Sequence, residues 1–391
     1  MKKILFVVHT LQVGGAEKVL LNILKNINKS KYDITVLAIV NDGIYVQDVK
    51  NIKGIKYKYV FNSLFKKARE NKNSKKHNLA KRMMNKIWKV YLWLLKYFPS
   101  IMYRIFVREK YDVEIAFLEG KVAKFVSHSK NKKSKKIAWI HTDINNKPSC
   151  SIFRNLEEEI KCYKKFYKII CVSDEVKNRF SNKTGITENI YVQLNPIDSE
   201  NILKKQDEKI TEELNNKGLI VCSVGRLVKE KGYDRLLEVH NRLIKESIEH
   251  TLWIIGDGVK KDELEKYIEE NNLKDTVNLV GYQKNPYKYI KKSDIFVCSS
   301  RVEGLSSVLL EAAIIGKPIV TTDCPGAKEI LGDDGQSALI VENSTEGLYL
   351  GMKTILEDIE LMRKFQVNIK KRSKLFNLQE AIKQIEKIID E

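Results

Sequence analysis

The sequence lacks the features that mark disulfide-linked, zinc-binding and secreted proteins. Its six cysteines form no Cys-x-x-Cys pair and have no histidine at metal-ligand spacing, so a disulfide framework and a structural zinc site are disfavoured. The opening apolar run Ile4–Val8 stops at His9 without a small-residue cleavage site, which argues against a signal peptide. We therefore expect reduced, mostly buried thiols in a cytoplasmic protein.

Motifs of several other protein classes are missing as well. No Gly-x-Gly-x-x-Gly fingerprint follows the first apolar run, so dinucleotide binding is disfavoured. No Asp-x-Asp metal motif is present, and Asp333 and Asp334 stand beside Gly335 in an expected turn. No RNA- or DNA-binding motif accompanies the basic residues. We expect neither a catalytic metal, nor a required cofactor, nor a nucleic-acid partner.

The chain has the length and the apolar content of two globular domains. It has 391 residues, of which 43% are hydrophobic, and that length exceeds one ordinary core. Short apolar runs alternate with helical stretches, which indicates parallel sheets covered on both faces. The runs are Ile4–Val8, Ile34–Val40, Val113–Phe117, Lys136–Ile140, Ile169–Val172, Leu219–Val224, Leu252–Ile255, Val277–Val280, Ile295–Cys298 and Pro318–Thr321.

The boundary between the two domains is expected at Asn195-Pro196, where an apolar run ends in a turn before a polar stretch. The alternation of apolar runs and helical stretches in each half then predicts one doubly wound, Rossmann-like α/β domain. Ligands of such domains bind at the carboxyl ends of the strands, so the loops after the apolar runs are the candidate sites.

Two loops in the second half carry candidate residues. Arg226 and Lys231 follow one strand, where two cations can bind a diphosphate and stabilise the charge of a departing phosphate group. Glu303 follows another strand, and Glu311 lies eight residues later on the next helix, whose free N–H groups favour a phosphate. Taken separately, the first pair also fits a solvated basic turn, and the second fits two ordinary surface acids.

Together these loops resemble a known enzyme family. The segments VGRLVKEKGYDRLL and SSRVEGLSSVLLEAA are similar to the donor domain of retaining glycosyltransferases with the GT-B fold, especially family 4, or glycosyl transferases group 1. The resemblance covers most of residues 190–345. It implies two Rossmann-like domains that face a cleft, with a C-terminal helix that crosses back to the first domain. The expected domains are 1–195 with about 376–391, which binds the acceptor, and 196–375, which binds the nucleotide sugar.

The resemblance also implies a role for each matching residue. Arg226 and Lys231 bind the diphosphate, Glu303 holds the transferred sugar, and Glu311 accepts from the ribose hydroxyls. Backbone groups of Gly304, Leu305 and Ser306 assist Glu303, and the base rests against Gly256, Gly258, Gly281 and Tyr282. The expected catalytic residues are Glu303, His141, Arg226 and Lys231.

The first half adds a glycine-containing loop and a histidine. Gly14 and Gly15 precede a helix that includes Glu17, and the family places this loop at the acceptor side of the cleft, although a simple turn is an alternative. His141 follows a strand in a Trp-x-His context like that of the family's cleft histidine, but it also fits a packed structural residue. Asp143 is a weaker candidate, and we do not expect it to act as a nucleophile.

A basic segment points to a membrane. Residues 1–195 hold 40 Lys and Arg against 16 Asp and Glu, a net charge of +24, whereas the remainder has −4. Within residues 61–110 the net charge is +12. Helical spacing places Arg82, Lys86, Lys89 and Lys96, with Trp93, opposite Met84, Trp88, Tyr91, Leu92 and Leu95. An interfacial helix on an anionic membrane fits this pattern, and so does a helix whose apolar face packs on the sheet.

The sequence therefore predicts a retaining, metal-independent glycosyltransferase. We expect it to move a hexose-type sugar from a nucleotide diphosphate sugar, with UDP the expected nucleotide, to a lipid-linked glycan acceptor. The expected setting is bacterial capsule or lipopolysaccharide synthesis on the cytoplasmic face of the membrane. The alternatives are a sugar-nucleotide 2-epimerase of the same fold, or a non-enzymatic scaffold that binds membranes or polyanions.

Overall fold

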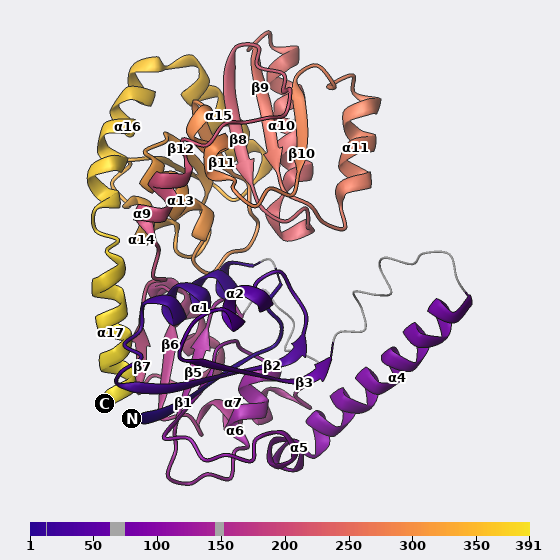
Figure 1. The fold of residues 1–391 in the computed structure, drawn as a ribbon. Coiled ribbons are helices and arrows are strands. Elements are labelled where there is room, and N and C mark those ends of the chain that lie inside the picture. Colours follow the sequence, from indigo (N-terminus) through magenta and orange to yellow (C-terminus); the bar gives the residue numbers. More distant parts are fainter. Residues whose placement is uncertain (13, 63–74, 145–151) are drawn as a thin grey trace. The chain divides into compact units, whose positions relative to one another are not determined.

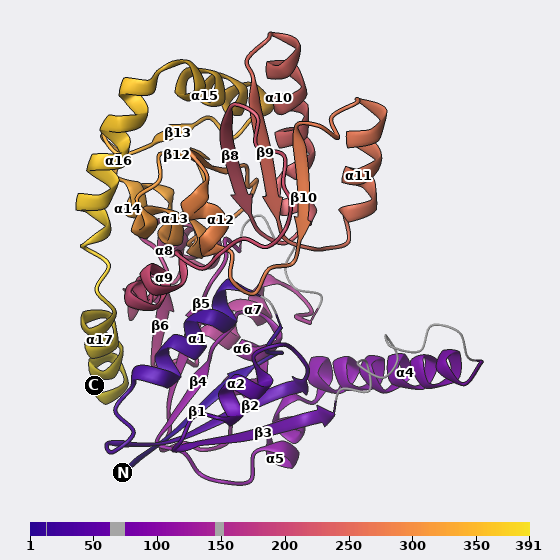
Figure 2. The same ribbon diagram turned by 45° about the horizontal axis from the view of Figure 1, so that its top comes forward.

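The computed structural model describes residues 1–12, 14–62, 75–144 and 152–391. The chain forms two compact units: unit 1 contains Met1–Pro196 and Gln379–Glu391, and unit 2 contains Ile197–Leu378. In each unit, helices cover both faces of a parallel sheet (Figures 1 and 2). The predicted pair of Rossmann-like, doubly wound domains is confirmed.

In unit 1 the described strands lie in the order β3-β2-β1-β4-β5-β6-β7, and all neighbours are parallel. The order reverses at β1, so the loops after β1 and β4 flank the point where ligands bind in such sheets. The strands are β1 Lys2–Val8, β2 Tyr32–Asn41, β3 Ile55–Asn62, β4 Val113–Ala116, β5 Lys135–Ile140, β6 Lys168–Cys171 and β7 Ile190–Val192. The helices are α1 Gly15–Asn26, α2 Val46–Lys50, α4 Lys75–Tyr97, α5 Pro99–Phe106, α6 Lys121–Ser127, α7 Leu156–Tyr163, α8 Asp174–Thr184 and α17 Leu378–Asp390.

In unit 2 the described strands lie in the order β10-β9-β8-β11-β12-β13, again with parallel neighbours, and the order reverses at β8. The strands are β8 Leu219–Val224, β9 His250–Ile255, β10 Val277–Gly281, β11 Ile295–Cys298, β12 Ile319–Thr322 and β13 Leu339–Val341. The helices are α9 Ser199–Lys205, a 3₁₀ turn at Lys229–Lys231, α10 Tyr233–Lys245, α11 Lys261–Glu270, α12 Tyr287–Lys292, α13 Ser307–Ile315, α14 Ala327–Leu331, α15 Thr345–Glu357 and α16 Ile359–Ser373.

The strands expected from apolar runs are all present, each within two residues of the expected bounds. Strands β3, β7 and β13 were not expected. Each lies at an edge of its sheet, and most of its side chains are half-buried or exposed. Lys56 and Lys58 interrupt the apolar residues of β3, and β7 and β13 have three residues each, which is too short to be recognised from apolar residues alone.

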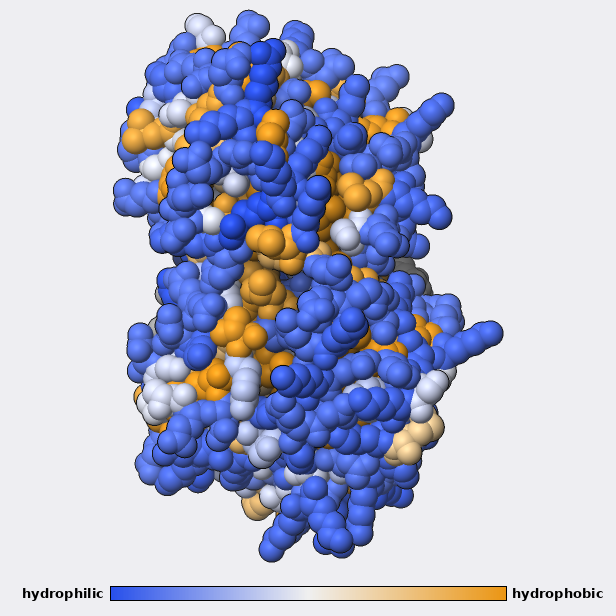
Figure 3. Space-filling view, turned by 90° about the vertical axis from the view of Figure 1, so that its left-hand side faces the viewer, coloured by the Kyte–Doolittle hydropathy of each residue, from blue (hydrophilic) through white to orange (hydrophobic). Residues whose placement is uncertain are grey.

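The C-terminal helix α17 packs on unit 1, as expected. Ile382, Ile385 and Ile389 are buried on one face of the helix. At its end, the Asp390 carboxylate lies 2.9 Å from the Lys2 ammonium group at the start of β1. On the side of the chain that carries α16 and α17, the surface is mostly hydrophilic, and hydrophobic side chains form small groups there (Figure 3).

The helix expected in the basic segment is α4, and the structure shows which of its faces is buried. Trp88 and Tyr91 stack with ring centroids 4.9 Å apart, and Phe61 of β3 makes edge contacts with both rings. Leu95 is fully buried. The apolar face of α4 thus packs on unit 1, which is one of the two expected arrangements, and Phe61 of β3 supplies its aromatic partner.

Some of the other residues predicted in this segment are exposed, and the side chains of others are not described. Lys86, Lys89 and Trp93 are exposed, whereas Arg82 and Met84 lie outside the described side chains. None of the described helices combines the length and the apolar character needed to cross a bilayer.

Two histidines form a hydrogen-bonded chain in the core of unit 2. His250 Nδ1 lies 2.9 Å from the Ile248 carbonyl and must donate, so His250 Nε2 accepts from His240 Nδ1 at 2.8 Å. His240 Nε2 then accepts from the Thr276 hydroxyl at 2.9 Å. With both imidazoles neutral, every ring nitrogen in this arrangement has a hydrogen-bond partner. Burial lowers the pKa of His240 to about 2, with a further contribution from His250, and burial also lowers the pKa of His250.

We predict that acid destabilises unit 2 through this pair. In the unfolded chain each imidazole binds a proton below about pH 6.5, whereas the folded state resists protonation, so stability is lost as the pH falls below that value. Because the folded-state pKa of His240 is about 2, this residue should cost about 2 kcal/mol at pH 5, and His250 adds to the loss. Thermal unfolding at pH 7.5 and 5 measures this loss. A His240→Leu/His250→Leu variant should lose less stability over the same range, and an equal loss would contradict the assignment.

Candidate active site

The loops at the carboxyl ends of β10, β9 and β8 lie against one another in unit 2. The Gly225 N–H donates to the Ile255 carbonyl, and the Gly256 N–H donates to the Gly281 carbonyl at 2.8 Å. A Cβ atom on Gly256 would lie 1.8 Å from the Gly225 oxygen, and one on Gly258 would lie 2.4 Å from the Leu227 oxygen. The packing of the loops therefore requires glycine at both positions. Tyr282, next to Gly281, leaves 45% of its surface exposed.

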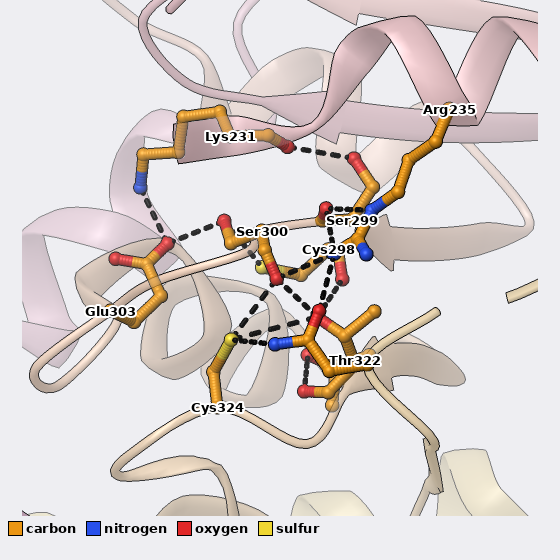
Figure 4. Close-up of polar contacts among 10 residues, drawn as sticks. Lys231, Arg235, Cys298, Ser299, Ser300, Glu303, Thr322 and Cys324 are labelled. Carbon is orange, nitrogen blue, oxygen red and sulfur yellow. Dashed lines mark hydrogen bonds and ion pairs between the residues drawn. The ribbon is translucent and has the colours of Figure 1, made fainter. Parts of the chain in front are cut away.

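Lys231 and Glu303 form the central contact of the site. The Lys231 ammonium group lies 2.6 Å from Glu303 Oε1, and the Ser300 hydroxyl donates to the same oxygen at 2.6 Å (Figure 4). Only 19% of the lysine side chain and 12% of the glutamate side chain are exposed. Burial acts to lower the pKa of Lys231, but the negative charge of Glu303 outweighs it and the pKa is raised. Lys231 thus stays charged in a site with little solvent.

Arg226 lies near this pair but is exposed. Its positive charge opposes the protonation of Lys231 and acts to lower the pKa of that ammonium group. Among the residues that the structure describes, no carboxylate lies within ion-pair distance of the Arg226 guanidinium. The two predicted phosphate-binding cations therefore share one loop, one of them paired with Glu303 and one open to solvent.

The loop that carries Glu303 leads into the N-terminus of α13. Ser306 is the N-cap residue, but its side chain makes no capping bond. Its hydroxyl is buried and has no hydrogen-bond partner among the described residues. Glu311, in the middle of α13, is 2% exposed. The first turn of α13 thus combines free backbone donors with a buried hydroxyl, which suits an anionic group.

Arg235, which the sequence analysis missed, fixes the Glu303 loop. It is 4% exposed on α10, and its guanidinium donates to the carbonyl of Ser299 at 2.7 and 3.0 Å and to that of Ser300 at 2.8 Å (Figure 4). A further bond reaches Asn343 Oδ1 at 2.8 Å. The Ser299 hydroxyl in turn donates to the Lys231 carbonyl at 2.9 Å. The loops that hold Lys231 and Glu303 are thus joined at several points.

In unit 1, His141 lies at the carboxyl end of β5. It is 8% exposed, and its Nε2 atom is buried without a partner among the described residues. Burial lowers the pKa of His141 to about 4, against the opposing effect of Glu119, so the ring is neutral at pH 7. Glu119 was also missed: its carboxylate accepts from the His141 N–H at 3.1 Å and from the Thr142 hydroxyl at 2.5 Å. Asp143 is buried and pairs with Arg179 at 2.5 Å.

The glycine-containing loop of unit 1 ends at the N-terminus of α1. Gly14 is the N-cap residue and Gly15 the first residue of the helix. A Cβ atom on Gly14 would lie 2.1 Å from Glu17 Oε2, so the Glu17 carboxylate lies over this position. The predicted residues Gly14, Gly15 and Glu17 are thus neighbours at one helix end.

Comparison with known proteins identifies the domain in unit 2. Residues 204–372 match the family model described as glycosyl transferases group 1. Unit 2 carries a group 1 glycosyltransferase domain. The resemblance inferred from the Arg226–Lys231 and Glu303–Glu311 segments is confirmed, while the roles of the individual residues remain predictions.

Similar proteins act on glycans. One from Campylobacter jejuni subsp. jejuni serotype O:2, named N-acetylgalactosamine-N,N'-diacetylbacillosaminyl-diphospho-undecaprenol 4-alpha-N-acetylgalactosaminyltransferase, is 38% identical over 207 residues, 53% of this chain and 54% of that protein. The amylovoran biosynthesis glycosyltransferase AmsD of Erwinia amylovora is 30% identical over 209 residues, 53% and 57% of the two chains. The matched part spans about half the length of these curated relatives.

A solved structure extends the likeness to the whole chain. The crystal structure of HepE from Anabaena in complex with UDP and glucose has a TM-score of 0.75 at 20% identity and covers 100% of both chains. At this identity the likeness concerns the fold. It confirms the predicted GT-B fold class for a chain that has a group 1 glycosyltransferase domain.

We predict that Arg235 contributes more to stability than an ordinary residue of α10. Replacing it by leucine leaves the Ser299 carbonyl without its buried donor, at a cost of about 1–3 kcal/mol, whereas the Ser300 carbonyl keeps its bond from the Thr322 hydroxyl at 2.6 Å. The Arg235→Leu variant should therefore unfold at a clearly lower urea concentration. Lys245→Leu, at an exposed position of the same helix, should stay within about 0.5 kcal/mol of the unaltered protein. Equal midpoints for the two variants would contradict the anchoring role.

Proposed function

We propose that this protein is a retaining, metal-independent glycosyltransferase that uses a nucleotide diphosphate sugar. The observation that carries the proposal is the Lys231–Glu303 pair, set beside Arg226 and the N-terminus of α13 in a group 1 glycosyltransferase domain. The site offers two cations, free helix N–H groups and the buried Ser306 hydroxyl within neighbouring loops. This is the chemistry that binds a diphosphate.

We assign the donor to unit 2 in three parts. Arg226, Lys231 and the first turn of α13 bind the diphosphate, and Glu303 accepts hydrogen bonds from the transferred sugar. Glu311 accepts from the ribose hydroxyls. The base lies along Gly256, Gly258, Gly281 and Tyr282, and a Cβ atom on Gly281 would meet nothing within 4 Å. Gly304, Leu305 and Ser306 supply backbone groups next to Glu303.

The reaction needs no protein nucleophile. The acceptor hydroxyl forms its bond to the anomeric carbon on the face from which the diphosphate leaves, so the configuration is retained. The bond between that carbon and the phosphate oxygen breaks, and this oxygen takes the hydroxyl proton. Lys231 and Arg226 stabilise the charge that develops on the diphosphate. His141, neutral at pH 7, contributes a hydrogen bond to the sugar rather than a charge.

We further propose UDP as the nucleotide and a lipid-linked glycan as the acceptor. The structurally similar HepE binds UDP, and the name of the Campylobacter relative contains a diphospho-undecaprenol acceptor. Unit 1, with the Gly14–Glu17 loop, is assigned to the acceptor. The net charge of +24 in residues 1–195 supports work at an anionic membrane, on its cytoplasmic face, in the synthesis of a surface polysaccharide such as capsule or lipopolysaccharide.

A binding and turnover experiment separates the predicted roles. In thermal-shift titrations with UDP in EDTA, Arg226→Ala should bind about 10- to 100-fold more weakly, because it loses a charge-assisted phosphate contact. Glu303→Ala should bind UDP at least as well as the unaltered protein, since Lys231 then faces the diphosphate without a competing carboxylate. Its turnover should fall about 100- to 1,000-fold.

Arg363→Ala is the matched control, because Arg363 is exposed and, among the residues that the structure describes, its guanidinium pairs with Glu360 alone. This variant should bind UDP and turn over normally. Unchanged UDP affinity in Arg226→Ala would refute the diphosphate assignment. Loss of the UDP shift in EDTA would refute metal independence.

A further inference from the structure

The helices α4 and α5 expose an apolar surface on unit 1. We call it the outer face. Its large apolar side chains are between 43% and 56% exposed, and they are Ile87, Val90, Trp93, Tyr97, Phe98, Ile101 and Ile105. Trp93 contacts Tyr97 and Phe98, with ring centroids 5.8 and 5.5 Å apart. Because Trp88, Tyr91 and Leu95 already fill the contact with the body of unit 1, the outer face is not part of the core. A contiguous exposed patch of this kind marks a docking surface.

A cavity of about 250 Å³ opens beside the outer face. Its lining consists of Leu92, Trp93, Lys96, Tyr97, Lys121 and Ile152, so α4 and α6 both contribute to it. The two lysines lie near aromatic rings: Lys121 Nζ is 5.5 Å from the centre of the Trp88 ring, and Lys96 Nζ is 5.9 Å from that of Tyr97. Within the described part of the chain, neither ammonium group has a carboxylate within 4.0 Å. The cavity thus presents two uncompensated cations among aromatic walls.

A buried lysine holds these walls in place. Lys124 of α6 is fully buried, and its ammonium group donates to the carbonyls of Lys96 and Ile152 and to the Glu158 carboxylate, each at 2.9 Å. One residue therefore ties the end of α4, Ile152 and α7 to α6. Glu158 is bound to Lys124 and also contacts Arg154. Its carboxylate therefore does not neutralise Lys96 or Lys121.

We propose that the outer face inserts into the surface of an anionic membrane and that Lys96 and Lys121 bind the phosphate of a lipid in the cavity. Trp93 lines the cavity and belongs to the outer face, so the two surfaces are continuous. Aromatic and aliphatic side chains suit the boundary between headgroups and acyl chains, and lysines suit the lipid phosphates. This docking surface rests on the proposed function, and it is the place where unit 1 meets the lipid.

The positive charge of unit 1 favours a membrane, rather than a second copy of the chain, as the partner of the outer face. A second copy of the chain would bring the same lysines to the contact, and like charges would oppose each other. Lys86, Lys89 and Arg104, all exposed, add to the positive potential beside the outer face. An anionic bilayer supplies both the apolar layer and the phosphates that this surface requires.

Vesicle sedimentation with the full chain tests the proposal. We expect binding to vesicles of 30% phosphatidylglycerol in phosphatidylcholine and little binding to phosphatidylcholine alone. Lys96→Gln/Lys121→Gln should weaken the binding about 10- to 30-fold. The control Lys132→Gln/Lys133→Gln removes the same charge from the exposed loop between α6 and β5, which does not line the cavity, and should change binding less than twofold. Equal losses in the two variants would overturn the cavity assignment.

Fluorescence tests the outer face without disturbing the fold. Trp93 is exposed, whereas Trp139 and Trp253 are buried and Trp88 packs on Tyr91. Brominated lipids should therefore quench the protein through Trp93, and Trp93→Phe should lose most of the quenching. Quenching that survives this substitution would overturn the proposed insertion. Competition by millimolar inorganic phosphate as strong as that by vesicles would show a free phosphate as the ligand instead of a lipid.

The UDP thermal shift, measured on the same preparations, separates this proposal from the proposed function. Vesicle binding without a UDP response would contradict the enzyme assignment and support the docking surface. A UDP response without vesicle binding would overturn the docking surface alone.

Discussion

The ion pair between Lys231 and Glu303 is the contact on which the candidate donor site depends. It joins residues 72 positions apart, from the loops after β8 and β11, which are neighbours because the strand order reverses at β8. Both side chains are largely buried, so the pair is screened little by solvent, and loss of either partner leaves a charge in a poorly hydrated place. The same two groups, a cation and a carboxylate, are those assigned to the diphosphate and the sugar. The pair thus keeps the site charged and ordered.

Buried cations that bind backbone carbonyls recur in both units. Arg235 holds the carbonyls of Ser299 and Ser300 in unit 2, and Lys124 holds those of Lys96 and Ile152 in unit 1. A cation bound mainly by carbonyls fixes the course of irregular backbone, because each loop oxygen must point at one donor. In each unit such an anchor lies beside the surface to which we assign a phosphate. The two candidate phosphate sites are therefore built on rigid supports rather than on free loops.

The sequence predicted the fold through its central strands. Runs such as Ile4–Val8 and Leu219–Val224 are largely buried, and most of their side chains are apolar. Strand β3 escaped recognition because lysines alternate with its apolar residues, and β7 and β13 escaped because each has only three residues. The candidate donor-binding residues could also be predicted, since Arg226, Lys231 and Glu303 follow recognisable strands. Glu119 follows the strand β4 in the same way, so position alone offered a signal that was not used.

What the sequence by itself determined is the alternation of strands and helices, the position of the chemistry after the strands, and the uneven charge of the two halves. These follow from local composition and from the two-sided burial of parallel sheets. Only the tertiary structure decided which face of α4 is buried, because Phe61 of β3 and Trp88 meet through folding rather than through spacing. It also decided that Arg235 anchors the Glu303 loop and that Lys124 closes the walls of the lysine cavity. Contacts of this kind join residues far apart in the chain, and no periodicity in the sequence records them.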